Sequence, residues 1–482
     1  MGFPNTRFTA KFHIVILLFL FASKAQAQSD KWIGQWVGNL QADQLRLAVM
    51  FKLEVKYGGW YSKINIPQQG VKNQTVSKTS IDKKTIRFEL ESFDAFYEGR
   101  KTDSNTIKGY FHQAGKSYQL TLKRVWGDWP KPKPQTPKKP YSFVDVPIRI
   151  PVANGRIMVG ATLSKPDSIG KFPVVVLISG SGPQDRNGTI GEHEPFLIFT
   201  DFFTKRGFAI FRYDDRGIGE TKGHPEVLKN TTSADIAMDV GLFVDYLKNR
   251  EDIDTNLIGL LGHSEGGIVA PMLAANRNDI SFIICLAGPA AGGMEASIYQ
   301  NEKLLRDNKV NKRNTRSFIK IHKQLISIGL HTNDTALAHL QMDSAVRKWK
   351  RGAPFKAKYI LFAGKKMNLN YVHKTYDFVQ IPWWKFFLGY DPVSDIQKLH
   401  CPVLALNGSR DDQVACHPNL DVFEQHIPNK NLSKVECLPG LNHLFQKCDK
   451  CTFSEYFSLS ESLNSALLNT MDSWMRSNNY IR

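Results

Sequence analysis

The segment from Leu257 to Ala275 constrains the fold of this chain more than any other. It begins with a short apolar run that favours a buried parallel strand, and it ends with small and apolar residues typical of a packed helix. Between them, residues 262–266 have the sequence Gly-His-Ser-Glu-Gly. A strand that turns this sharply into a helix leaves no room for side chains beside the serine. The pattern predicts a tight turn that exposes the hydroxyl of Ser264.

Strands and helices alternate on both sides of this turn. Apolar runs predict further buried strands at residues 172–178, 208–213, 279–288, 401–408 and 435–438. Helical periodicity lies between them at residues 195–206 and 233–250, and a closing helix is predicted at 460–476. This alternation predicts an α/β fold with a mostly parallel sheet flanked by helices. Residues 290 to about 395 interrupt the rhythm with mostly helical sequence, which predicts a cap inserted above the strand ends.

The N-terminus has the features of a signal peptide over residues 1–27. Arg7 and Lys11 precede an apolar run at residues 14–22, and Ala25-Gln26-Ala27 resembles a cleavage site. The apolar run is too short to span a bilayer comfortably. We expect cleavage before Gln28, export to the periplasm or the extracellular space, and no stable membrane anchor in the mature protein.

Residues 28–127 differ from the rest because short runs alternate apolar and polar residues between turn residues. This predicts a small antiparallel β domain, a barrel or a sandwich. Trp32, Trp36, Trp60 and Tyr61 belong to its core or line a ligand groove, and the core interpretation is favoured. Residues 128–140 are rich in proline and lysine, which predicts a stiff linker before a catalytic domain at 141–482.

Composition excludes some classes of function. The chain has 482 residues, of which 42% are hydrophobic and 22% charged, so it is not disordered throughout. Its net charge of +18 is scattered, with no arginine stripe among aromatics, so nucleic acid is not an expected partner. Cys448 and Cys451 either form a local disulfide or stay free, and no ligand spacing indicates a metal. We expect neither a metal nor an organic cofactor.

A serine hydroxyl becomes a nucleophile when a histidine takes its proton and a carboxylate orients that histidine. Asp411 follows one late predicted strand and His443 follows the next, so the order is Ser264, acid, histidine. Asp412 is the alternative acid. The backbone N–H groups of Glu265 and of Ser181, in a small-residue loop after residue 178, are the expected oxyanion donors.

Four motifs give the chain a resemblance to the α/β-hydrolase superfamily, and within it to bacterial EstD-type carboxylesterases. They are residues 177–186 (LISGSGPQDR), 212–219 (RYDDRGIG), 262–267 (GHSEGG) and 438–446 (LPGLNHLFQ). The resemblance covers the chain from about Tyr141 onward, and it implies that Asp411 rather than Asp412 is the acid. Members of this family often carry a comparable β domain before the hydrolase.

These observations predict a serine hydrolase that cleaves small carboxylic esters through an acyl-enzyme. An exopeptidase of dipeptidyl-peptidase type and an acyltransferase share the same machinery. A protein that only binds polysaccharide or lipid is the alternative outside enzymes. Residues 214–220 are expected to brace the site, whereas Trp383, Trp384, Phe386 and Phe387 either wall a substrate pocket or bury the cap. The natural substrate, the disulfide pairing and the oligomeric state stay open.

Overall fold

The computed structural model describes residues 32–42, 45–56, 59–66, 71–113, 115–125, 133–362, 368–456 and 459–481. The chain divides into two compact units, with the main boundary between residues 131 and 132. The predicted signal peptide and residues 128–132 of the predicted linker lie outside the described residues. Within these ranges, no helix is both long enough and apolar enough to cross a membrane.

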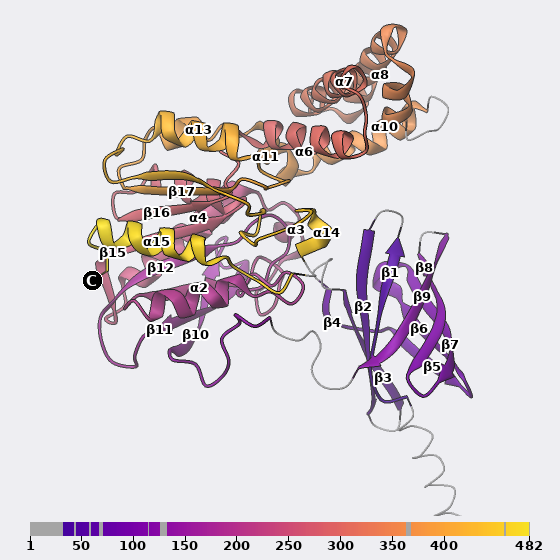
Figure 1. Cartoon of the computed structure of the whole chain (residues 1–482), viewed down its shortest axis with the longest axis horizontal. Coiled ribbons are helices and arrows are strands. Elements are labelled where there is room, and N and C mark those ends of the chain that lie inside the picture. The colour runs from indigo at the N-terminus through magenta and orange to yellow at the C-terminus, as the bar shows by residue number, and fades with distance from the viewer. Residues whose placement is uncertain are drawn as a thin grey trace, which may run out of the picture. The chain divides into compact units, whose positions relative to one another are not determined.

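The first unit is a single nine-stranded antiparallel sheet. A hydrogen bond of 2.8 Å from Thr79 to Ser62 joins a strand at one end of the sheet to a strand near the other end, so the sheet curls on itself. Trp36 is fully buried and Trp32 is 2% exposed, which confirms that both belong to the core. Its strands are β1 (Gly34–Ala42), β2 (Leu45–Lys56), β3 (Gly59–Ile66), β4 (Val71–Thr75), β5 (Lys78–Asp82), β6 (Thr85–Leu90), β7 (Ala95–Asp103), β8 (Thr106–Gln113) and β9 (Lys116–Val125) (Figure 1).

The second unit is built on a mixed sheet with the strand order β10-β11-β13-β12-β15-β16-β17-β18. Strand β11 is antiparallel to both of its neighbours, and every pair from β13 to β18 is parallel. The strands are β10 (Val144–Val152), β11 (Ile157–Lys165), β12 (Phe172–Ile178), β13 (Ala209–Tyr213), β14 (Lys222–Gly223), β15 (Ile253–His263), β16 (Phe282–Leu286), β17 (Val403–Gly408) and β18 (Lys434–Leu438). This is the α/β-hydrolase fold that the sequence predicts.

Helices cover both faces of this sheet (Figure 1). On one face, apolar side chains of α4 (Ser233–Lys248), α5 (Gly266–Ala274) and α13 (Cys416–His426) form the core. On the other face, α2 (Pro195–Thr204) and α15 (Ser465–Ser477) do so. Short helices lie in the loops: α3 (Pro225–Lys229), α12 (Val393–Ile396) and α14 (Phe453–Tyr456).

The closing helix begins five residues later than the sequence predicts. The side-chain oxygen of Asn464 accepts a hydrogen bond from the N–H of Ala466, and α15 begins at Ser465. An asparagine in this role ends the extended chain before the helix, because its side chain satisfies a backbone donor that the helix leaves unpaired.

A helical segment stands between β16 and β17 and has an apolar core of its own. We call it the cap. Its helices are α6 (Gly293–Asp307), α7 (Lys312–His331), α8 (Thr335–Gly352), α9 (Phe355–Leu361), α10 (Leu369–Tyr376) and α11 (Pro382–Gly389). The hydroxyl of Tyr299 in α6 and the indole N–H of Trp383 in α11 donate to residues of the sheet's loops, so the cap contacts the strand ends on which the site is built.

Candidate active site

The turn between β15 and α5 holds Ser264 in a strained conformation. Its φ is +54°, a left-handed value that residues with side chains seldom adopt. A Cβ on Gly262 would lie 1.9 Å from the carbonyl oxygen of Gly266, and one on Gly266 would lie 2.3 Å from that of Ile178. The two glycines are therefore required by close backbone approach, as the sequence predicts, and such strain is typical of functional sites.

Ser264, His443 and Asp411 lie in one hydrogen-bonded row, although 179 residues separate the first two along the chain. The Oγ atom of Ser264 is 3.1 Å from Nε2 of His443. The Nδ1 atom of His443 is 2.7 Å from Oδ2 of Asp411. Both His443 and Asp411 are 3% exposed, so little water competes for these contacts. This row has the atoms and distances that general-base activation of a serine requires.

Asp411 is oriented by the backbone of its own loop. Its Oδ1 atom accepts hydrogen bonds of 2.8 Å from the N–H groups of Gln413 and Val414, which leaves Oδ2 for His443. Asp412 points elsewhere, because its Oδ1 atom accepts a bond of 2.7 Å from the hydroxyl of Tyr456. The structure thus brings Asp411, and not the alternative acid, to the histidine.

Two further side chains steady the row, and the sequence analysis missed both. His263, next to the serine, donates from Nε2 to the carbonyl oxygen of His443 at 2.9 Å. Burial lowers the pKa of His263 to about 3, so its ring stays neutral at ordinary pH. Tyr299 of the cap donates to the carbonyl oxygen of Asp411 at 2.9 Å. His263 stands inside the serine motif, which was a signal for it, whereas nothing near Tyr299 in sequence marks that residue.

The loop after β12 lies against the serine. A Cβ placed on Gly180 would be 3.0 Å from the Cβ of Ser264, and Ser181 lines the cavity beside it. Asp215 holds this loop by accepting bonds from the hydroxyl of Ser179 at 2.6 Å and from the N–H of Gln184 at 2.8 Å. Burial raises the pKa of Asp215 to about 8. The loop from which we expect the second oxyanion donor is thus fixed by a neighbouring carboxyl group.

Two more pairs brace the same region. Asp214 accepts from Arg186 at Nε and Nη2, with distances of 3.1 and 2.7 Å, and from the N–H of Glu220 at 2.8 Å. Arg216 binds both carboxylate oxygens of Asp239 at 2.7 and 2.8 Å. Residues 214–220 therefore position the loops around the serine, and Asp214, Asp215 and Arg216 also line the cavity there.

A cavity of about 540 Å³ opens beside the serine turn. Its lining includes Glu265, whose Oε1 atom accepts from the indole of Trp383 at 2.7 Å and from the hydroxyl of Ser233. Glu265 is 3% exposed, and burial raises the pKa of its carboxyl group. Its side chain is a scaffold of the turn and an anchor for the cap. Trp383 and Trp384 line the cavity, whereas Phe387 packs on Gly293 within the cap.

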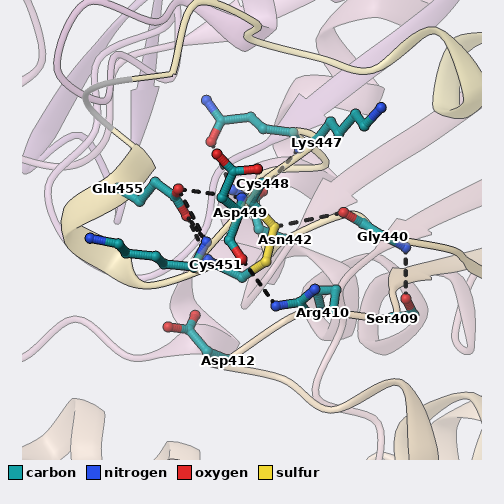
Figure 2. Close-up of a disulfide and its surroundings, with 12 residues drawn as sticks. Ser409, Arg410, Asp412, Gly440, Asn442, Lys447, Cys448, Asp449, Cys451 and Glu455 are labelled. Carbon is teal, nitrogen blue, oxygen red and sulfur yellow. Dashed lines mark hydrogen bonds between the residues drawn. A yellow bond between two sulfur atoms is a disulfide. The ribbon is translucent and has the colours of Figure 1, made fainter.

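The disulfide Cys448–Cys451 closes a loop beside Arg410 (Figure 2). The guanidinium of Arg410, the residue before the acid, donates to the carbonyl oxygen of Asp449 at 3.2 Å. Glu455 accepts from the N–H groups of this loop, for example that of Lys450 at 2.9 Å. The loop supports the segment that carries Asp411. This pairing is one of the two alternatives left open by the sequence.

A second disulfide, Cys416–Cys437, joins the start of α13 to β18, while Cys285 and Cys401 are buried and free. The sequence did not indicate that pairing. Among the described residues, no group of three or more His, Cys, Asp or Glu side chains is arranged to hold a metal ion.

Comparisons with known proteins agree with this fold. The family model described as "Serine aminopeptidase, S33" matches residues 187–356. The esterase EstD of Thermotoga maritima is 26% identical over 337 residues, which cover 70% of this chain and 68% of that protein. The acyl-coenzyme A thioesterase 1 of Mus musculus is 26% identical over 156 residues, and the match spans only about a third of each protein (32% of this chain and 33% of that one).

Among solved structures, the Pyrococcus furiosus esterase Pf2001 gives a TM-score of 0.41 with 14% identity, and the match covers 73% of this chain and 96% of that one. The α/β hydrolase GrgF from Penicillium sp. sh18 also gives a TM-score of 0.41, with 16% identity, over 69% of this chain and 98% of that one. The sheet order and the sequence matches to the family model and to EstD confirm the resemblance predicted from the motifs. The chain has the α/β-hydrolase fold and is similar in sequence to the esterase EstD.

Proposed function

We propose that this protein is an exported serine hydrolase that cleaves carboxylic esters through Ser264, His443 and Asp411. The observation that carries the proposal is the row of hydrogen bonds at 3.1 and 2.7 Å that links the three side chains. The similarity to an esterase over 70% of the chain supports ester bonds as the substrate.

The reaction has two steps. His443 takes the proton of Ser264 as its oxygen attacks the ester carbonyl, and Asp411 stabilises the imidazolium that forms. The N–H groups of Glu265 and Ser181 hold the negative oxygen of the tetrahedral intermediate. His443 then gives the proton to the leaving alcohol. A water molecule, activated by the same histidine, releases the acid from Ser264.

The test compares the mature protein with Ser264→Ala on p-nitrophenyl esters of increasing acyl length and on aminoacyl p-nitroanilides. We expect ester turnover in the mature protein, a fall of at least about 10³-fold in the variant, and no anilide turnover. Anilide turnover would favour the exopeptidase alternative. Ester turnover that survives in Ser264→Ala would refute the proposal.

Export is part of the proposal and rests on residues 1–27. We expect expression of the full chain in a bacterial host to deliver a mature protein that begins at Gln28. N-terminal sequencing of the protein from the periplasmic fraction checks this. An intact N-terminus in the cytoplasmic fraction would contradict it.

A further inference from the structure

One end of the cavity beside the serine turn is formed by residues that adjoin Ser264. Glu265 follows Ser264 directly, and Gly180 and Ser181 belong to the loop that lies against it. Among the described residues that line the cavity, none comes from the loops that carry His443 and Asp411. In the proposed reaction the leaving alcohol takes its proton from His443 and lies on that side. The cavity therefore accepts the other half of the ester, which is the acyl group.

The walls of the cavity are largely apolar and aromatic. Val159 and Leu228 lie beside four rings, those of Tyr213, Phe243, Trp383 and Trp384. The ring centroids of Tyr213 and Phe243 are 4.8 Å apart. A volume of about 540 Å³ is within the range of pockets that hold small organic ligands, far more than an acetyl group fills. The walls thus favour a bulky acyl group with a ring or a branched chain.

The charges on the walls disfavour an anion. Four carboxyl groups line the cavity, those of Asp214, Asp215, Asp239 and Glu265. The one arginine among the lining residues in the described part of the chain, Arg216, is already bound to Asp239 through two nitrogens. An acyl group with its own carboxylate would lose its hydration there and find no free cation to replace it.

One polar atom of the wall is left without a partner. The hydroxyl of Tyr213 is buried and makes no hydrogen bond to any described residue, although the side chain is only 8% exposed. Burial raises the pKa of Tyr213 well above its ordinary value, so the hydroxyl keeps its proton and can donate. Buried hydroxyl groups without partners are rare because burial removes their bonds to water. Tyr213 lines the cavity, and a rotation of its side chain would bring this unpaired hydroxyl to a substituent of the occupant.

We propose that the cavity selects bulky, uncharged acyl groups that carry a hydroxyl or carbonyl substituent, and that Tyr213 is the residue that recognises this substituent by a hydrogen bond. The proposal rests on the ester hydrolysis proposed above. Tyr213 is then a determinant of specificity at the far end of the acyl group, distinct from the groups that break the ester bond. A site built to bond a substrate hydroxyl discriminates strongly against analogues that lack it, because its own polar atom is then left unpaired.

The experiment uses p-nitrophenyl esters of phenylacetic, phenylpropanoic and phenylbutanoic acid, each as the plain compound and with a para hydroxyl or a para carboxylate. The three chain lengths place the substituent at three depths in the cavity. We expect kcat/KM of the wild type to favour the hydroxylated ester at least fivefold over the plain ester at one or more lengths. We expect the carboxylate esters to react at least tenfold more slowly than the plain ones.

In Tyr213→Phe, the preference for the hydroxylated ester should fall to within twofold, with an unchanged or higher Tm because an unpaired buried hydroxyl is removed. The matched control is Tyr246→Phe on α4, where the hydroxyl accepts a hydrogen bond from Arg250, and this variant should keep the preference. A wild type without the preference overturns the inference, whether or not the variant folds, and so does a preference that survives in Tyr213→Phe. Either result refutes only this inference. The proposed function stays intact as long as the wild type hydrolyses the esters and Ser264→Ala does not.

Discussion

Two loops of the same sheet bury carboxylates at the ends of strands, and the two use them differently. Asp214, after β13, and Asp411, after β17, are each 3% exposed. The oxygens of Asp214 accept from Arg186, in the loop after β12, and from the backbone. One oxygen of Asp411 is held by the backbone in the same way, but the other faces His443. A buried acid can therefore hold a loop or assist a proton transfer, and the partner of its second oxygen decides which.

Replacement of the acid is the largest expected effect. Asp411→Asn keeps the shape of the side chain but removes the negative charge that orients His443 and stabilises its protonated form. We expect kcat to fall by about 10³- to 10⁴-fold, as in other triads, with a folded protein and little change in KM. Steady-state kinetics on a p-nitrophenyl ester and a thermal melt followed by circular dichroism check both parts.

Asp412→Asn is the matched control, because the same change one residue away touches Tyr456 and not His443. We expect its kcat to stay within about tenfold of the wild type, since the loop loses part of one supporting bond. A loss in Asp412→Asn as large as that in Asp411→Asn would mean that the loop, and not the identity of the acid, sets activity.

The same type of substitution at Asp214 tests the loop after β13. Asp214→Asn removes the carboxylate that Arg186 binds through two nitrogens and leaves only the more exposed Glu220, at 3.2 Å. We expect the free energy of unfolding to fall by roughly 2–4 kcal/mol, because the side chain of Arg186 is only 18% exposed and its charge loses its main partner. Urea unfolding measures it. The ratio of kcat to the fraction of folded protein should change far less than in Asp411→Asn, and a loss of kcat without a loss of stability would contradict the comparison.

These loops also show which features of the fold and the site can be predicted from the sequence. Apolar runs such as residues 172–178 determine the parallel sheet, and flanking glycines determine the serine turn, because both depend on local pattern. The choice between Asp411 and Asp412 depended on a family resemblance, since two adjacent acids in a loop look alike until their rotamers are seen. The catalytic role of the row stays a prediction that the substitutions test.

What the sequence did not reveal depends on contacts between distant segments. His263 reaches a carbonyl 180 residues away, and Tyr299 reaches the acid loop from the cap. The unpaired hydroxyl of Tyr213 is visible only when every neighbour is in place. No periodicity or spacing carries such information, because it arises from how the packed elements aim their side chains.

The smallest expected effect is a pH dependence of stability that comes from Asp215. Burial raises its pKa to about 8 in the folded protein, whereas an aspartate in an unfolded chain has a pKa of about 4. Between these values the folded protein keeps a proton that the unfolded chain releases. The free energy of unfolding must therefore fall as pH rises from about 4 to about 8, with a slope of at most one proton from this group.

Asp215→Asn removes that titration, because an amide does not ionise. We expect urea unfolding at half-unit steps from pH 5 to 8 to show a shallower decline in the variant than in the wild type. At pH 5 the variant should have the lower free energy of unfolding, since its amide nitrogen cannot accept one of the two hydrogen bonds from Ser179 and Gln184. The difference in free energy between the two proteins should narrow as pH rises. Asp254→Asn, a surface control, should run parallel to the wild type. If the free energy of unfolding of Asp215→Asn also changes with pH in parallel with that of the wild type, Asp215 is ionised in the folded protein. The loop after β13 would then hold its neighbours with a charged carboxylate, as Asp411 holds His443.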